Sequence, residues 1–238
     1  MGKEILKWEK KYMQPRKEPK ILVWDLEFKG SDNWRHELKI FPGYLLCYAG
    51  KELNNPEVKV LSRRQFPGKT VNDDRALVRA IGNELRDVDC HVFQYGTKID
   101  FRFIQTKLLQ YGFRTLPEPP VFIDTCTVAR QKLALSSNSM RTQAEFFKLR
   151  EKKRSITRQE WDRAFALEDS VLKLVEARCA SDVRITEQLF HRLKKLVHNH
   201  PVYKRFWNNG IRATAKTQYR RKHCKNCGVA NFEVLKKK

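Results

Sequence analysis

Two acidic residues one position apart interrupt an apolar run near the start of the chain. Asp25 and Glu27 lie in the segment 21–28, ILVWDLEF, whose first four residues are apolar. Four successive apolar residues indicate a buried strand, in which positions i and i+2 share a face, so both carboxylates point the same way. Burying unpaired carboxylates is costly, and a divalent cation is the strongest candidate to offset that cost. The pair predicts a metal site; the alternative is a strand end where both acids face solvent.

Two further aspartates occur where helices could place them beside this strand. Asp100 follows a predicted strand and opens a helix, a position from which a side chain can reach the carboxyl edge of a sheet. Asp182 precedes Leu189 by two helical turns and so shares its inward face. Each aspartate alone could be a helix cap or an ion-paired residue. Together with the first pair they can hold two divalent ions about 3.5–4 Å apart, which suits attack on a phosphodiester.

The net charge indicates a polyanionic partner. Among 238 residues, 49 Lys and Arg outnumber 27 Asp and Glu, giving a formal net charge of +22. This excess exceeds what solubility requires, so we expect DNA or RNA to bind, with a merely solvated basic surface as the alternative. An acidic membrane surface fits less well, because no clean basic amphipathic helix stands out.

Apolar segments and cysteines indicate the compartment. No run of about 18 apolar residues occurs, so we expect no transmembrane helix and no membrane partner. The first 20 residues lack the apolar core of a signal peptide. The six cysteines are mostly scattered within apolar segments, which indicates reduced core thiols instead of a disulfide framework. We therefore expect an intracellular, cytoplasmic protein.

Five short apolar segments are predicted as strands of one sheet. The first three would form an antiparallel meander, because turn-rich connections join them. The last two alternate with helices, which is typical of parallel strands. The five segments are 20–28, 44–50, 57–61, 89–95 and 121–124. This order predicts an α/β domain with a mixed five-stranded sheet flanked by helices.

Apolar residues at helical spacing predict three helices among and after the strands. The first begins near Arg75, and Asp73 or Asp74 can cap it. The second begins at about Asp100, and the third has Ser139 as its candidate cap. Their apolar faces are formed by Leu77, Ile81 and Leu85, by Phe101, Ile104, Leu108 and Tyr111, and by Met140, Ala144 and Phe147.

The end of the domain is predicted to be helical. The charged segment 150–163 is expected to cross the surface as an exposed connection. From Leu167 the helical period returns, and it continues through Asp182 to His198 if the helix is unbroken. The predicted inward face consists of Leu167, Val171, Leu174 and Arg178, followed by Leu189, Leu193, Leu196 and Val197.

Three parts are expected along the chain: a basic N-terminal extension (1–19), a domain (20–200) and a basic tail (201–238). The tail interleaves basic and aromatic residues, which suits phosphate contact and base stacking. The alternative is a solvated tail anchored by Trp207. The candidate nucleic-acid contacts in this part are Arg220, Arg221 and Lys222.

A cysteine pair in the tail has the spacing of a zinc ribbon. Cys224 and Cys227 form the Cys-x-x-Cys of KHCKNCG, but no second cysteine pair follows. His223, His200 or His198 could complete the coordination of Zn²⁺, as could another chain. The alternative is a remnant that binds no metal.

Four segments, in order, resemble the motifs of DEDD-type 3′→5′ exonucleases, the DnaQ-like branch of the ribonuclease H-like superfamily. They are WDLE (24–27), YGTKIDFRFI (95–104), IDTCTVAR (123–130) and RCASDVRITEQLF (178–190). The chain is similar in style to phage and bacterial ribonuclease H-like proteins with a C-terminal zinc ribbon. The resemblance, which covers about residues 20–200, implies a ribonuclease H-like fold. It also implies that two Mg²⁺ or Mn²⁺ ions are bound by Asp25, Glu27, Asp100 and Asp182, with Asp124 in a supporting role.

The sequence departs from this family at two places. Tyr95 and Gly96 stand where an Asn usually precedes the second acid. Arg178 and Ala177 occupy the places of the Tyr or His that orients or deprotonates the attacking water. Arginine stays protonated and cannot act as a general base. It could pair with Asp182 one turn later or face outward to bind phosphate.

The resemblance implies a metal-dependent nuclease, a 3′→5′ exonuclease that hydrolyses phosphodiesters of DNA or RNA. Lys98 and Arg102, on either side of Asp100, are candidate nucleic-acid contacts together with Arg178. The alternative is a catalytically weakened or inactive nucleic-acid-binding subunit of a larger assembly, with other protein subunits as partners. Arg178 and the high charge favour this alternative, whereas the presence of all four acids opposes it.

Overall fold

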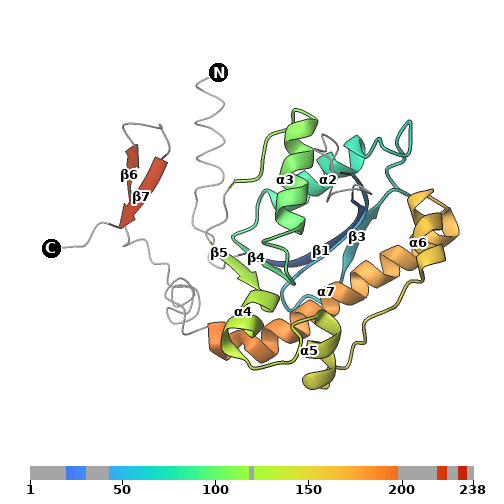
Figure 1. Cartoon of the computed structure of the whole chain (residues 1–238). Coiled ribbons are helices and arrows are strands. Elements are labelled where there is room, and N and C mark those ends of the chain that lie inside the picture. Colours follow the sequence, from blue (N-terminus) through green and yellow to red (C-terminus); the bar gives the residue numbers. More distant parts are fainter. Residues whose placement is uncertain (1–19, 31–42, 118–120, 198–218, 224–229, 235–238) are drawn as a thin grey trace, which may run out of the picture. The chain divides into compact units, whose positions relative to one another are not determined.

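The protein is described by a computed structural model that defines residues 20–30, 43–117 and 121–197, together with the backbone of 219–223 and 230–234. Within the first three ranges, five strands form one sheet in the order β3-β2-β1-β4-β5 (Figure 1). The strands are β1 (Ile21–Lys29), β2 (Tyr44–Glu52), β3 (Lys59–Ser62), β4 (Cys90–Phe93) and β5 (Val121–Asp124). The pairs β1–β2 and β2–β3 are antiparallel, whereas β1–β4 and β4–β5 are parallel. The predicted fold class, a mixed five-stranded α/β sheet consistent with a ribonuclease H-like fold, is confirmed.

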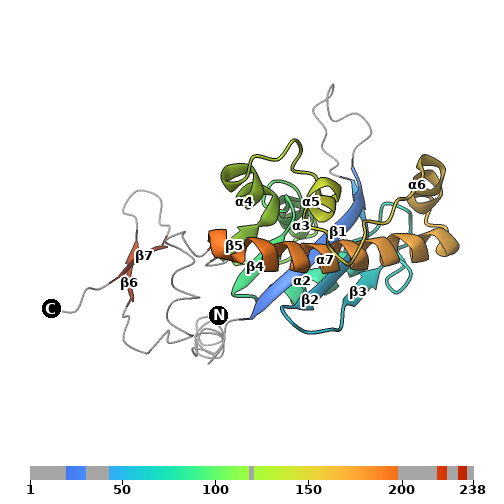
Figure 2. The ribbon, with the colours of Figure 1, turned by 90° about the horizontal axis from the view of Figure 1, so that it is seen from below.

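Helices cover both faces of this sheet. Figure 2 shows α7 crossing one face, while α2 and α3 lie on the other. The helices are α2 (Arg75–Leu85), α3 (Asp100–Gln110), α4 (Thr125–Lys132), α5 (Met140–Phe146), α6 (Arg158–Phe165) and α7 (Asp169–Val197). Because side chains alternate along a strand, β1 presents its two sets of residues to different layers. Leu22, Trp24 and Leu26 join the core with α2 and α3, and the acids face α7.

The core beneath α2 and α3 is built around a buried tryptophan. Trp24 is fully buried, and its indole N–H donates to Nδ1 of His91 at 3.0 Å. Burial lowers the pKa of His91 to about 3, so the imidazole stays neutral and can accept this bond. The ring of Phe93 meets the indole edge-on at 5.5 Å between centroids. This contact set ties β1 to β4 behind the acidic residues.

Two predictions for the C-terminal part of the domain were wrong in part. The segment 150–163 is not only a connection, because α6 begins at Arg158. The predicted inward face of the last helix is correct from Leu189 on but not at its start, where Leu174 is 46% exposed and Leu167 lies before α7 with φ of +63°. The buried face instead runs through Val171, Leu172, Val175 and Cys179, because α7 packs along the sheet. Helix α4, between 125 and 132, was not predicted.

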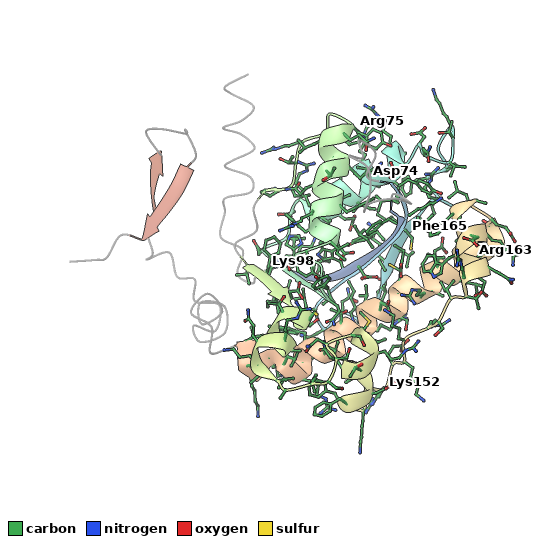
Figure 3. All side chains as sticks on the ribbon, viewed as in Figure 1. Asp74, Arg75, Lys98, Lys152, Arg163 and Phe165 are labelled. Atoms are coloured by element: carbon green, nitrogen blue, oxygen red, sulfur yellow. The ribbon has the colours of Figure 1, made fainter. Side chains whose placement is uncertain are left out.

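Helix α2 begins at Arg75 as predicted; of its two expected caps, Asp73 accepts from the N–H of Arg75 at 3.4 Å, and Asp74 has another role. The side chain of Asp74 makes no capping bond; it accepts from the backbone N–H of Leu45 at 2.8 Å and lies 2.9 Å from Lys107 Nζ. Both side chains of this ion pair are completely buried (Asp74 is labelled in Figure 3). Lys107 also donates to the carbonyl oxygen of Gly43 at 3.0 Å. The pair therefore joins α3 to the start of α2 and the start of β2.

Helix α6 has a complete capping box, which leads to a stability prediction. The hydroxyl of Thr157 accepts from the N–H of Glu160, and the Glu160 carboxylate accepts from the N–H of Thr157. Replacing Thr157 by alanine is expected to lower the free energy of unfolding by about 1 kcal/mol, because a helix-end N–H loses its acceptor. Denaturant titration measures this loss. The control is Thr106→Ala, which removes an exposed hydroxyl that donates to a carbonyl of its own helix. This substitution should change stability by less than about 0.5 kcal/mol. Equal losses in both variants would contradict the prediction.

A second, two-stranded sheet is described by its backbone alone. Strands β6 (Tyr219–His223) and β7 (Ala230–Val234) are antiparallel, and Arg220, Arg221 and Lys222 lie within β6. The candidate zinc ligands Cys224 and Cys227 lie outside the described residues, so zinc binding stays a prediction. The predicted domain boundaries also stay predictions. No helix in the described ranges combines the length and apolarity needed to cross a membrane.

Candidate metal centre

Three carboxylates from two elements converge on the α7 side of the sheet. Asp25 and Glu27 come from β1, and Asp182 comes from the middle of α7. Each offers a ligand oxygen, and these oxygens all lie within 4.8 Å of one another. Oxygen donors at such separations fit a hard divalent cation. The prediction that acids distant in sequence come together is therefore met for these three.

Asp182 is the most deeply buried of the three acids. Its side chain is 3% exposed, and Oδ1 finds no hydrogen-bond partner among the described residues. A buried carboxylate oxygen without a partner is costly, and a cation would remove the cost. On the preceding turn, the thiol of Cys179 donates to the backbone oxygen of Asp25 at 3.5 Å, which fixes α7 against β1.

Asp100 lies in the same pocket but outside the group of three. It is the first residue of α3, is buried, and its Oδ1 accepts from the backbone N–H of Leu26 at 3.3 Å. This bond holds the start of α3 against the middle of β1. Asp100 lines the pocket together with the other three acids, so the structure brings all four predicted residues to one place.

Asp124 holds the loop that precedes Asp100. Its carboxylate accepts from the N–H groups of Tyr95 and Thr97 at 2.9 and 3.2 Å and from the hydroxyl of Thr97 at 2.6 Å. It also caps α4 by accepting from the N–H of Thr127 at 3.1 Å. These bonds shape the loop that leads into Asp100, in agreement with the supporting role that the resemblance implies.

Burial raises the pKa of three acids in the pocket. Burial, with repulsion from Asp100, raises the pKa of Asp25 well above its usual value. Burial raises the pKa of Asp100 to about 7. The pKa of Glu27 is also raised by burial, although Arg178 opposes the shift. Without added cations Asp100 therefore holds its proton up to near neutral pH.

Arg178 pairs with the acids, one of the two orientations considered for it. Its Nε donates to Glu27 Oε1 at 2.8 Å, and Nη2 lies 3.5 Å from Asp182 Oδ2. Its Nη1 donates to the carbonyl oxygen of Arg154 at 2.7 Å, and the guanidinium lies 5.7 Å from the ring centre of Trp161. A role of Arg178 in nucleic-acid binding stays a prediction.

A second cation at the cluster was missed in the sequence. Lys153 Nζ lies 3.1 Å from Asp182 Oδ2, and it comes from the segment between α5 and α6. The hydroxyl of Ser181 on α7 holds this segment by donating to Glu151 at 3.0 Å or to the Lys152 carbonyl at 3.2 Å. No periodicity in this charged segment indicates which lysine faces inward.

The acids open into a pocket with a volume of about 520 Å³. Beside the acids it is lined by Tyr95, which is 37% exposed, and by Arg130, whose guanidinium lies 5.5 Å from the centre of the Tyr95 ring. Lys98, labelled in Figure 3, and Arg102 are exposed next to the start of α3. Aromatic and basic side chains thus flank the acidic centre.

Comparison with known proteins gives a structural match and no sequence match. No family model matches the sequence, and no curated protein matches it. Among solved structures, 147 chains match. One is the family B DNA polymerase from the hyperthermophilic archaeon Pyrobaculum calidifontis, with a TM-score of 0.58 and 14% identity. What is shared is the fold. The match covers 77% of this chain and 26% of the polymerase chain.

The raised pKa of Asp100 predicts how stability depends on pH when divalent ions are removed. Between its unfolded pKa of about 3.8 and its folded pKa of about 7, the folded chain holds a proton that the unfolded chain releases. The free energy of unfolding should therefore fall as the pH rises through this window. The fall should be smaller for Asp100→Asn, which cannot titrate. Denaturant titrations in EDTA at pH 5 and pH 7.5 measure the free energy of unfolding of both proteins. An equal fall between the two pH values in both proteins would refute the prediction.

Proposed function

We propose that this protein is a metal-dependent nuclease of the DEDD type that hydrolyses phosphodiesters in DNA or RNA. The observation that carries the proposal is the buried Oδ1 of Asp182, which has no partner among the residues that the structure describes. Asp182 forms a group with Asp25 and Glu27 in which one ligand oxygen of each lies within 4.8 Å of the others. Asp100 in the same pocket supports it. One matching structure is a DNA polymerase by name, and the net charge of +22 favours a polyanionic substrate.

The acids would hold Mg²⁺ or Mn²⁺, because hard cations prefer carboxylate oxygens. When bound, such an ion supplies positive charge to the phosphate oxygens and lowers the pKa of water. The chain itself contributes the fixed charge of Arg178, which cannot accept a proton. Neither Arg178 nor Ala177 can serve as a general base. In this proposal the activation of water depends on the carboxylate cluster and the ion it would hold.

The surroundings of the pocket suit a flexible strand. The Tyr95 ring offers a stacking surface for a base, and Arg130 and Lys98 offer contacts to phosphates. We propose a single-stranded end as the substrate, and the 3′→5′ direction rests on the motif resemblance. The intracellular location and the nucleic-acid contacts of Arg102, Arg220, Arg221 and Lys222 remain part of the proposal.

A second candidate is a binding subunit that does not cleave. It is favoured by Lys153 and Arg178, which already neutralise part of the acidic cluster. In this reading the basic exterior would still bind nucleic acid within a larger assembly.

A cleavage assay separates the two functions. Single-stranded and double-stranded DNA and RNA, labelled at the 5′ end, are incubated with the protein and Mg²⁺ or Mn²⁺, and a matched reaction contains EDTA. The nuclease predicts stepwise shortening from the 3′ end that EDTA abolishes. Circular single strands, which have no end, should stay intact. Binding without any metal-dependent cleavage would overturn the nuclease in favour of the binding subunit.

A further inference from the structure

Two side-chain cations are already in contact with the acidic cluster. Lys153 and Arg178 both approach Oδ2 of Asp182, at 3.1 and 3.5 Å. Arg178 also bonds Glu27 Oε1. When a bound ion displaces their protons, the four carboxylates around the pocket would carry four negative charges, and these two cations balance two of them. The remaining charge corresponds to one divalent ion.

Some carboxylate oxygens of the cluster already have partners, and one does not. Oδ2 of Asp182 and Oε1 of Glu27 face the cations, and Oδ1 of Asp100 accepts a backbone N–H. Oδ1 of Asp182 is the buried oxygen without a partner among the described residues. A cation bound to this oxygen would use none of the oxygen atoms that pair with Lys153 and Arg178. A second cation would have to displace Lys153 or Arg178 or accept their repulsion.

Both cations are held in position by contacts outside the cluster. Arg178 is held by the carbonyl oxygen of Arg154 and by the ring of Trp161, and its side chain is only 16% exposed. Lys153 passes Met140 with Nζ 4.0 Å from its sulfur, on a segment anchored to Ser181 of α7. Side chains restrained in this way act as fixed charges.

We propose that the cluster binds one divalent ion, and that Lys153 and Arg178 take the electrostatic place of the second ion that the motif resemblance implies. This inference rests on the proposed function and specifies the metal requirement of the same site. In this proposal Lys153 is a positioning residue whose charge sets the affinity of the cluster for divalent ions and the number of ions bound.

Calorimetric titration with Mn²⁺ alone tests the number of ions. The full chain is compared with Asp25→Asn, which retains any ion bound elsewhere, so that the difference counts ions at the cluster. Both titrations are repeated with a saturating single strand that carries hydrolysis-resistant phosphorothioate linkages, because a substrate can supply further ligands. A difference of one ion in both states is expected. A difference of two in either state would overturn the inference while leaving the nuclease in place. No difference would overturn both.

Removing one fixed charge tests the role of Lys153 without an activity measurement. Lys153→Met keeps the length of the side chain, and it is expected to raise the affinity of the cluster for Mn²⁺ by about tenfold or more, because a nearby positive charge is lost. The control is Lys152→Met, which removes an exposed lysine of the same segment and should leave the affinity unchanged. Equal affinities for the two variants would overturn the inference. Thermal melts in EDTA confirm that each variant folds.

Discussion

Replacing Asp25 by asparagine is expected to lower the rate of metal-dependent cleavage by about a thousandfold or more. Asp25 belongs to the group of three acids whose ligand oxygens lie within 4.8 Å of one another, and burial, Asp100, Glu27 and Asp182 all act to raise its pKa. Loss of its charge weakens cation binding, and a bound cation contributes several kcal/mol to stabilising the transition state, of which about 4 kcal/mol corresponds to a thousandfold. Initial rates on a labelled single strand with Mg²⁺ measure the effect.

The fold should survive this substitution. Burial and the neighbouring acids raise the pKa of Asp25, so the folded chain already favours the neutral side chain, and asparagine should not lower the melting temperature in EDTA. Asp162→Asn is the matched control, since it removes an exposed aspartate on α6 and should leave the rate unchanged. Full activity of Asp25→Asn would show that the cleavage comes from another site or from a contaminant.

Replacing Lys107 by methionine is expected to destabilise the domain by about 3–5 kcal/mol. The ammonium group is completely buried against Asp74 and donates to the Gly43 carbonyl. Its removal leaves the Asp74 carboxylate buried without its compensating charge, which costs far more than the pair itself contributes. Denaturant titration at neutral pH measures the free energy of unfolding.

An exposed ion pair of the same kind provides the control. Lys59 pairs with Glu84 at the surface, where the lysine side chain is 53% exposed. Lys59→Met should therefore cost less than about 1 kcal/mol, because solvent screens such pairs. Comparable losses in the two variants would contradict the view that burial decides the cost at Lys107.

Local periodicity was sufficient to predict most of the acidic centre. Asp25 and Glu27 share a face because side chains alternate along a strand, and Asp182 faces inward because two helical turns separate it from Leu189. The antiparallel meander and the parallel strands after it were also predicted from the sequence of strand and helix segments. These features depend on neighbours along the chain, which a sequence displays directly.

The cations beside the acids depend on packing between distant segments. Lys153 faces the acidic centre because Ser181 holds its segment against α7. No periodic pattern within residues 150–157 indicates this contact. Leu174 was predicted to be buried because the spacing fits, but the sheet selects a face of α7 rotated away from it. In contrast, α6 could have been predicted, since Thr157 and Glu160 have the spacing of a capping box.

Because α7 is one continuous helix, insertions and deletions within it would change which residues face the sheet. The helix packs against β1, β2, β3 and β4 and carries both Arg178 and Asp182. Deleting one residue between the packed first turns and Asp182 would rotate that aspartate by about 100° around the helix axis. Among descendants of this sequence, insertions and deletions should therefore accumulate in connections such as the mostly exposed segment 53–58 and be rare in the first half of α7.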